Sequence, residues 1–138
     1  MSNRKSTLFG GSGGDIFEDN LNQVVRMVKV EVYGCNYVDS IRTTYLLTDG
    51  SYRVDTHGGP GGSLAGTLTL SEDEYICYAR IKYGIYVDNL VLATNKLTHL
   101  YAGGNGGDYT REFKEGKVEG FYGRSAIFID AIGFLFIA

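Results

Sequence analysis

Apolar and polar residues alternate with a period of two along most of the chain. In the segment 28–33, valines at every second position are separated by lysine, glutamate and tyrosine, and in 67–70 leucines alternate with threonines. Such alternation puts one set of side chains on each face of a strand, so each segment is predicted to be a half-buried strand. Similar runs predict strands over 41–47, 51–56, 75–83, 86–93, 97–101, 117–121 and 127–137.

Glycine-rich turns separate these segments, and no window carries the apolar spacing of a helix. The chain of 138 residues contains 20 glycines, 11 tyrosines and a single proline. This composition is typical of many short strands joined by tight turns, and the length is that of one domain. We therefore expect an all-β domain spanning residues 1–138 with essentially no helix.

Two sequence elements each occur three times. The first reads aromatic, β-branched, aspartate, small or polar, aliphatic, and it occupies 37–41, 86–90 and 128–132. The second is a loop with two pairs of glycines at 10–14, 58–62 and 103–107. The loops begin 48 and 45 residues apart, and the aspartates stand 49 and 42 residues apart. Near-constant spacing indicates one unit of about four strands used three times, with the third copy split between the two termini.

Two threefold all-β architectures fit such repeats: a β-trefoil, and a prism of three four-stranded antiparallel sheets with pseudo-threefold symmetry. Trefoil lectins usually carry a Gln-x-Trp signature in each repeat, whereas this chain has no tryptophan. The paired glycines also have no place in the trefoil pattern. The sequence therefore favours the prism.

The net charge and the two terminal segments argue against nucleic acid and membranes as partners. The net charge is −3 without a basic stripe, which argues against nucleic acid as a partner. Residues 1–9 lack the apolar run of a signal peptide, and 131–138 are too few to cross a bilayer. We expect a cytoplasmic or non-classically secreted protein that does not insert into a membrane by this domain.

The two cysteines are predicted to be free thiols. Alternation in 75–83 places Cys77 on the buried face with Ala79 and Ile81, whereas Cys35 falls in a loop. A cysteine on an inward strand face and a loop cysteine make a poor disulfide pair, and two thiols do not make a zinc site.

No motif for catalysis is present. The two histidines, His57 and His99, have no partner at a recognisable spacing, and Asp55 near His57 is interpreted as chance. The acidic turn 72–74 is interpreted as a solvated face. A nucleophile elbow, a phosphate-binding Gly-Lys-Ser/Thr loop and a metal-ligand cluster are all missing from the sequence. We expect no enzyme activity, no cofactor and no metal.

The run from Gly123 to Gly133 resembles the C-terminal signature of jacalin-related lectins. The glycine loop at 10–14, the segment 74–76 and the segment 94–96 resemble the same family, in the same order along the chain. The resemblance spans nearly the whole chain. It implies a β-prism I fold and carbohydrate binding without a metal ion.

The repeated elements have the chemistry that a sugar site needs. A sugar hydroxyl both donates and accepts hydrogen bonds, so a shallow site needs a fixed acceptor and fixed donors. An ionised aspartate can accept from two adjacent hydroxyls, and backbone N–H groups supply donors. A glycine loop lets the backbone approach the ligand, and an aromatic residue beside the aspartate can cover an apolar face of the sugar ring.

In jacalin-related lectins the motif is Gly-x-x-x-Asp, in which the first two x positions and the aspartate touch the sugar and the last glycine of a partner loop completes the pocket. Carried over, the first site consists of Gly14, Ile127, Phe128 and Asp130. Ala126 stands where the family has glycine. If that position needs a positive φ, alanine costs about 1 kcal/mol or shifts the loop.

The other two repeats give two more candidate sites. By threefold symmetry each aspartate pairs with the glycine loop that follows it, and Asp130 pairs with the N-terminal loop. The second site consists of Asn36, Tyr37, Asp39 and Gly62, with a cysteine in the glycine place. The third site keeps the full motif and consists of Ile85, Tyr86, Asp88 and Gly107.

The resemblance also bears on the sugar. Galactose-preferring members are cut so that a free glycine amine lies in the site, whereas nine residues precede Gly10 here. We therefore expect mannose- or glucose-containing glycans as partners, bound weakly at each of several sites and more tightly through multivalency within the chain or in a homodimer. Agglutination of glycan-coated cells would follow.

Two alternatives remain open from the sequence. The Val-Asp and Ile-Asp repeats could be architectural, with the glycine pairs serving only as tight connections. In that case the chain would be a protein-interaction module, or a targeting domain from a larger, for example pore-forming, protein, with sugar binding reduced or lost.

Overall fold

The computed structural model describes residues 3–138 of the chain. These residues form thirteen β-strands and no helix, as the sequence predicts. It follows that no helix long and apolar enough to span a membrane occurs in this part of the chain.

Sheet 1 is built from one continuous stretch of the chain. Its centre is the hairpin of β4 (Val24–Gly34) and β5 (Val38–Leu47). The next strand, β6 (Tyr52–Gly58), pairs with β5, and β7 (Ser63–Thr69) crosses to pair with β4. The order across the sheet is β6-β5-β4-β7, with all pairs antiparallel.

Sheet 2 repeats this arrangement. The hairpin of β8 (Ile76–Tyr83) and β9 (Val87–Thr94) forms its centre. β10 (His99–Gly103) pairs with β9, and β11 (Tyr109–Phe113) pairs with β8. The order β10-β9-β8-β11 is that of sheet 1 with each strand advanced by one repeat.

Sheet 3 joins the two ends of the chain. Its hairpin is β12 (Lys117–Ser125) and β13 (Ile129–Ile137), and β3 (Asp15–Glu18) pairs with β12. The outer strand beside β13 comes in two short pieces, β1 (Arg4–Lys5) and β2 (Phe9–Gly10). The N-terminal segment therefore supplies the outer strands of the C-terminal repeat.

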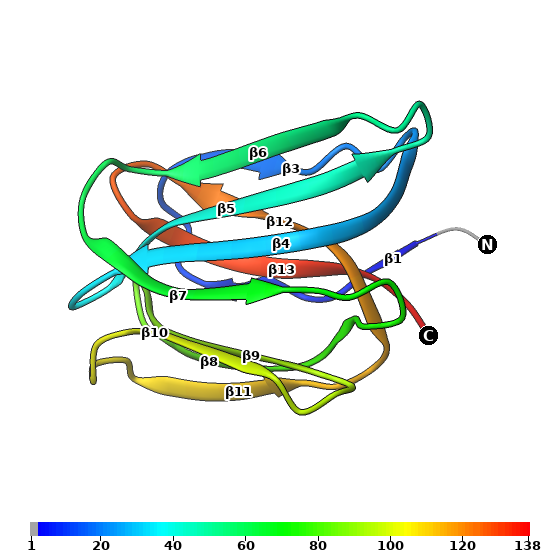
Figure 1. The fold of residues 1–138 in the computed structure, drawn as a ribbon. Coiled ribbons are helices and arrows are strands. Elements are labelled where there is room, and N and C mark those ends of the chain that lie inside the picture. The colour runs from blue at the N-terminus through cyan, green and yellow to red at the C-terminus, as the bar shows by residue number, and fades with distance from the viewer. Residues whose placement is uncertain (1–2) are drawn as a thin grey trace.

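The three sheets face one another around a common core (Figure 1). Sheets 2 and 3 are linked at one edge by the single pair Val118–Ile76, while sheet 1 shares no ladder with either. The hairpins of all three sheets run in the same sense, so their connecting loops gather at the end of the molecule away from the two termini (Figure 1). The predicted prism of three antiparallel sheets with pseudo-threefold symmetry is confirmed.

The core is made by the inward faces of the predicted strands. Val30, Val32 and Leu68 are fully buried, as their alternation with polar residues predicts. Between sheets 2 and 3, Phe113 stacks on Phe134 with ring centroids 4.7 Å apart. Phenylalanine side chains thus fill the space between these two sheets, in a chain that has no tryptophan.

The prediction for Cys77 is wrong in part. The pairing of β8 with β9 shifts by one residue between Ile76 and Tyr78, so the strict alternation slips at this β-bulge. Ile76 takes the inward position and is fully buried, whereas Cys77 is only half-buried. Both cysteines are free thiols, as predicted, and Cys35 is exposed in its loop.

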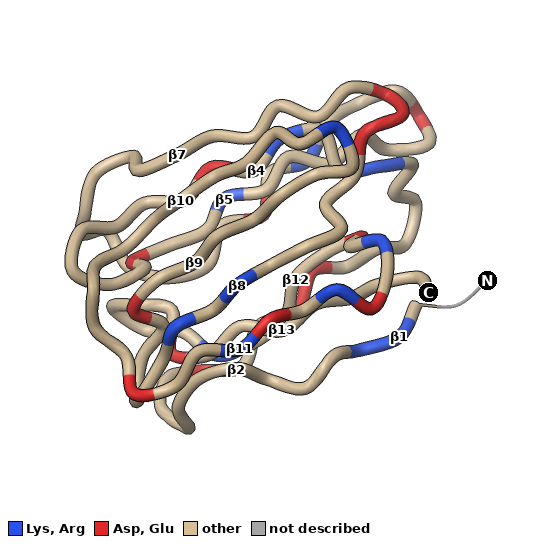
Figure 2. Tube along the Cα trace, turned by 90° about the horizontal axis from the view of Figure 1, so that it is seen from below, with Lys and Arg blue, Asp and Glu red and all other residues tan. Residues whose placement is uncertain are grey.

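Charged residues of both signs are intermingled over the surface. Figure 2 shows Lys and Arg positions of β8 beside Asp and Glu positions on neighbouring segments, and neither sign forms a continuous stripe in that view. Surface charge is therefore expected to affect ligand binding only where a single charged residue lies beside a site residue.

Candidate functional site

The three hairpin loops 35–37, 84–86 and 126–128 have one geometry. In each loop the backbone N–H of the first residue donates a hydrogen bond to the carbonyl of the third. The N–O distances are 3.1 Å from Cys35 to Tyr37, 3.0 Å from Gly84 to Tyr86 and 3.0 Å from Ala126 to Phe128. Cysteine, glycine and alanine therefore occupy equivalent positions of the same loop.

Ala126 would strain the first site only if its backbone had a positive φ, and its φ is not positive. Among the residues that the structure describes, the non-glycine residues with positive φ are Gln23 and Leu97, and Gly84 is not among the glycines with positive φ. The first loop position is thus accessible to any L-residue, so alanine does not strain the first site.

Each predicted aspartate is the second residue of its strand and is nearly enclosed. The relative exposure is 6% for Asp39, 9% for Asp88 and 5% for Asp130. Burial is the main cause that raises the pKa of all three carboxyls above the usual aspartate value. Oδ1 of Asp130 is buried and accepts no hydrogen bond from the protein, so it is an acceptor without a donor.

Each aspartate is tied through its backbone to the glycine loop with which the sequence paired it. The second glycine of each loop donates its N–H to the aspartate carbonyl. The N–O distances are 3.0 Å from Gly59 to Asp39, 2.9 Å from Gly104 to Asp88 and 2.9 Å from Gly11 to Asp130. The structure thus brings together the loops of all three predicted sites.

The last glycines of each loop lie against the carboxylate. A Cβ added to Gly13 would lie 2.9 Å from Oδ2 of Asp130, and one added to Gly14 would lie 2.6 Å from Oδ1. Gly14 also has a φ of +74°, a conformation that L-residues rarely adopt. At the second site Gly62 has a φ of +73° and the same relation to Asp39, at 2.8 Å. A side chain at either position would occupy the space above the carboxylate.

The third site departs from this pattern in its glycine. A Cβ on Gly106 would lie 2.6 Å from Oδ2 of Asp88, whereas one on Gly107 would meet the backbone of Tyr83 instead. Gly107, which the sequence placed in the site, therefore shapes the turn with its φ of +109°, and Gly106 faces the carboxylate.

The aromatic residues of the three loops pack against one another. Ring centroids are 5.3 Å apart for Tyr37 and Tyr86, 4.8 Å for Tyr37 and Phe128, and 5.0 Å for Tyr86 and Phe128. We call these three residues the aromatic triad. The sequence predicted a ring beside each aspartate, and it missed that the three rings form a single half-buried cluster between the sites.

The glycine loops also interlock with the hairpin loops of other repeats. A Cβ on Gly11 would collide with the carbonyl of Ile85, and one on Gly59 with the carbonyl of Ile127. The side chains of Ile85 and Ile127 are 74% and 64% exposed, and Asn36 at the equivalent position is exposed as well. The three candidate sites therefore ring the triad at one end of the molecule, each supported by its neighbour.

Charged groups near the sites were not predicted from the sequence. Arg124 donates from Nε to the Gly13 carbonyl at 3.0 Å and from Nη2 to the Gly14 carbonyl at 2.9 Å, bracing the loop of the first site. Its charge partly offsets the effect of burial on the pKa of Asp130. At the third site the charge of Asp108 adds to burial in raising the pKa of Asp88.

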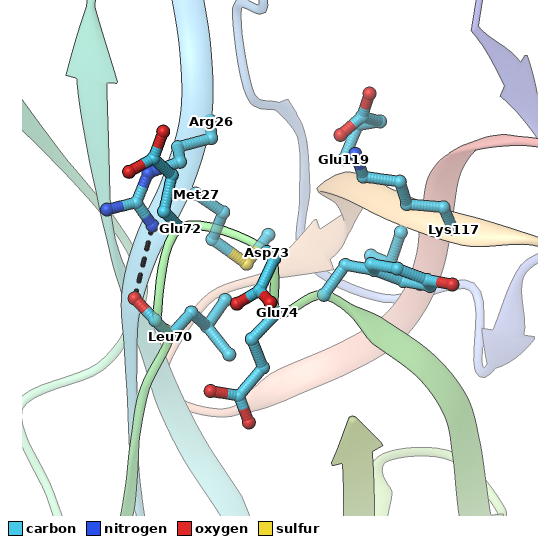
Figure 3. Close-up of a pocket in the computed structure, with 10 residues that line it drawn as sticks. Arg26, Met27, Leu70, Glu72, Asp73, Glu74, Lys117 and Glu119 are labelled. Carbon is cyan, nitrogen blue, oxygen red and sulfur yellow. Dashed lines mark hydrogen bonds between the residues drawn. The ribbon is translucent and has the colours of Figure 1, made fainter. Parts of the chain in front are cut away.

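A separate hollow of about 150 Å³ lies at the opposite end of the strands, where β4 and β12 begin (Figure 3). Arg26 donates to the Leu70 carbonyl at 3.1 Å on one side of it. Glu74, in the turn predicted to be simply solvated, accepts a 2.6 Å bond from the Thr94 hydroxyl, which together with further hydrogen bonds lowers its pKa to about 2. None of the predicted site residues lines this hollow.

His57 has a buried partner that the sequence did not suggest. Its Nε2 lies 2.6 Å from Oδ1 of Asp19, and the Tyr45 hydroxyl donates to the other oxygen of Asp19. Asp55 instead pairs with Arg53, with Nε 2.8 Å from Oδ1. Asp19, Asp55 and His57 lie close enough to hold a metal ion. They would have to give up these bonds to do so, and we interpret the group as a polar link between sheets 1 and 3.

Comparison with known proteins agrees with this geometry. The model of the jacalin-like lectin domain family matches residues 6–135. Horcolin from Hordeum vulgare subsp. vulgare is 33% identical over 135 residues, which are 91% of this chain and 91% of that protein.

Among solved structures, wild-type Malaysian banana lectin has a TM-score of 0.87 at 26% identity and covers 98% of both chains. A complex of artocarpin with mannotriose has a TM-score of 0.83 at 20% identity, covering 100% of this chain and 99% of that one. The second likeness shows the β-prism fold alone. The family is one of carbohydrate-binding lectins rather than enzymes, and with the family model matching nearly the whole chain, this protein belongs to the jacalin-like lectins.

Proposed function

We propose that this lectin binds mannose- or glucose-type sugars without a metal ion, at the three sites closed by Asp39, Asp88 and Asp130. The observation that carries the proposal is the threefold repetition of one arrangement. In every copy a nearly enclosed carboxylate lies beneath a glycine turn, and the turn is tied to the aspartate backbone at 2.9–3.0 Å. Architecture alone needs the backbone bond, but it does not need a carboxylate kept clear of side chains.

The chemistry of each site follows from this arrangement. The carboxylate accepts from two neighbouring sugar hydroxyls, and the glycine turn lets the ring approach without a Cβ in the way. The lone acceptor Oδ1 of Asp130 gains a donor when a hydroxyl arrives, which removes the cost of a buried acceptor without a partner. Mannose as the sugar is supported by the artocarpin–mannotriose complex, a protein of the same fold.

Three sites on one end make the protein multivalent. A shallow site with millimolar affinity supplies only about −4 kcal/mol. When several sites face the same glycan-coated surface, the second and third binding events become intramolecular, and avidity rises. We therefore propose that the protein agglutinates mannose-bearing cells. A homodimer would strengthen agglutination by adding further binding sites.

Calorimetric titration with methyl α-mannoside tests the proposal. We expect up to three equivalents bound per chain, binding that survives a chelator, and weaker binding of methyl α-galactoside. Replacing Asp39, Asp88 and Asp130 one at a time by asparagine should remove about one equivalent each. Full binding by the triple variant would overturn the assignment of these sites.

A further inference from the structure

The residue that follows each glycine loop is an aspartate at two of the three sites. It is Asp15 at the first site and Asp108 at the third, whereas Ser63 follows the loop of the second site. The Asp108 backbone is fixed by its N–H, which donates to the Tyr83 carbonyl at 2.9 Å. Its side chain leans over the hairpin loop, because a Cβ added to Gly84 would lie 3.2 Å from Oδ2 of Asp108.

The Asp108 carboxylate is exposed to solvent. Among residues 3–138 no hydrogen bond or ion pair engages it. The charge of Asp108 raises the pKa of Asp88, and the charge of Lys82, two residues before the hairpin loop, lowers it. The third site thus has a second carboxylate on its rim, in addition to the one beneath the glycine turn.

The other two sites lack this second negative charge at the carboxylate. At the first site Asp15 is exposed and is not among the charges that act on Asp130, and the neighbouring charge that does act on it is the guanidinium of Arg124. At the second site burial is the cause of the raised pKa of Asp39, and the neutral Ser63 takes the position of Asp108. The charge that acts on the site carboxylate is therefore a cation at the first site and an anion at the third, and the second site has a neutral serine in the position of Asp108.

We propose that Asp108 makes the third site selective for the charge of the sugar, favouring amino sugars and rejecting uronic or sulfated sugars. This inference rests on the proposed function. An ammonium group on the ligand would find an unpaired carboxylate within the site, whereas an acidic sugar would meet a second negative charge. Because Asp108 is solvent-exposed, the expected discrimination is about fivefold in affinity for each charged ligand relative to the neutral sugar.

The test isolates the third site. A parent variant with Asp39→Asn and Asp130→Asn keeps only Asp88, and a daughter variant adds Asp108→Asn. Methyl α-glucoside, its 2-amino derivative and its uronic acid are titrated into both at low salt. We expect Asp108→Asn to lower the amine-to-neutral affinity ratio about fivefold and to raise the acid-to-neutral ratio by a similar factor. Both effects should shrink in 0.5 M NaCl.

The outcomes separate the two proposals. Ratios that do not change on Asp108→Asn, while methyl α-glucoside binds, would overturn the role of Asp108 and leave the sugar site intact. No binding of methyl α-glucoside to the folded parent variant would overturn the third site itself, and the role of Asp108 with it. A matched variant that keeps only Asp130, beside Arg124, should show the reverse preference and favour the acidic sugar.

Discussion

Replacing Phe128 by alanine should weaken all three sites, although Phe128 belongs to only one of them. The substitution removes two ring pairs of the aromatic triad, with centroid distances of 4.8 Å to Tyr37 and 5.0 Å to Tyr86. Each aromatic pair contributes about 0.5–1.5 kcal/mol. Because Phe128 is half-buried, the lost burial adds about 1 kcal/mol more. We expect the free energy of unfolding to fall by about 2–4 kcal/mol, at or below the usual range for a fully buried phenylalanine.

The effect on binding follows from the interlocked loops. The loop of Phe128 supports the glycine loop of the second site, since Gly59 packs on the Ile127 backbone. Loss of the ring should loosen that support, and Tyr37 and Tyr86 lose their common neighbour. The affinity for methyl α-mannoside should therefore drop at Asp39 and Asp88 as well as at Asp130.

Urea unfolding measures the effect on stability, for which Ile127→Ala is the matched control, and calorimetric titration measures binding at each aspartate. Ile127 is itself a predicted sugar contact of the first site, so its variant controls for stability alone. Ile127 is adjacent in the same loop but 64% exposed, so its truncation should change stability by no more than about 0.5 kcal/mol. A Phe128→Ala protein that loses binding only at Asp130, with stability like the control, would refute the shared cluster. The rings would then act as separate surfaces for the sugar.

Three further substitutions test the glycine turn, the site carboxylates and the buried Asp19. Gly14→Ala should abolish binding at Asp130, because the new Cβ lies 2.6 Å from its Oδ1; Gly50→Ala, also at positive φ but with open space around it, should cost only about 1 kcal/mol of stability and leave binding intact. Burial raises the pKa of the site aspartates above 3.8, so sugar binding should already weaken on acidification at a pH above that value. The same shift makes the contribution of these carboxyls to folding most favourable below pH 3.8, and that contribution is lost as the pH rises through the raised pKa. The melting temperature of Asp130→Asn, relative to that of the wild type, should therefore be higher at pH 7 than at pH 3.5. Tyr45→Phe should cost about 1–3 kcal/mol in urea unfolding by removing a donor from buried Asp19, with titration showing unchanged sugar affinity.

The sequence was sufficient for features that recur with a period. Strand alternation gave the inward faces, and the spacing of the repeats predicted that Asp130 meets the N-terminal glycine loop more than a hundred residues away. Gly13 and Gly14 do lie against that carboxylate. These features could be predicted because the same local geometry requires the same residue types in each of the three repeats, so the pattern is visible in the sequence.

Contacts between repeats have no such signature. The packing of Tyr37, Tyr86 and Phe128 into a triad depends on where the symmetry axis falls, and the link from His57 to Asp19 joins segments from different sheets. Local irregularities were equally hidden. The bulge at Cys77 displaces one residue in an otherwise alternating strand, and the φ of Ala126 is set by the hairpin rather than by the residue type.

A crystal structure of the protein saturated with methyl α-mannoside tests the central claim most directly. We expect sugar at Asp39, Asp88 and Asp130, with two adjacent hydroxyl oxygens about 2.5–3.0 Å from each carboxylate and the ring above the glycine turn. Sugar bound elsewhere, for example in the hollow where β4 and β12 begin, with all three carboxylates unoccupied, would contradict it.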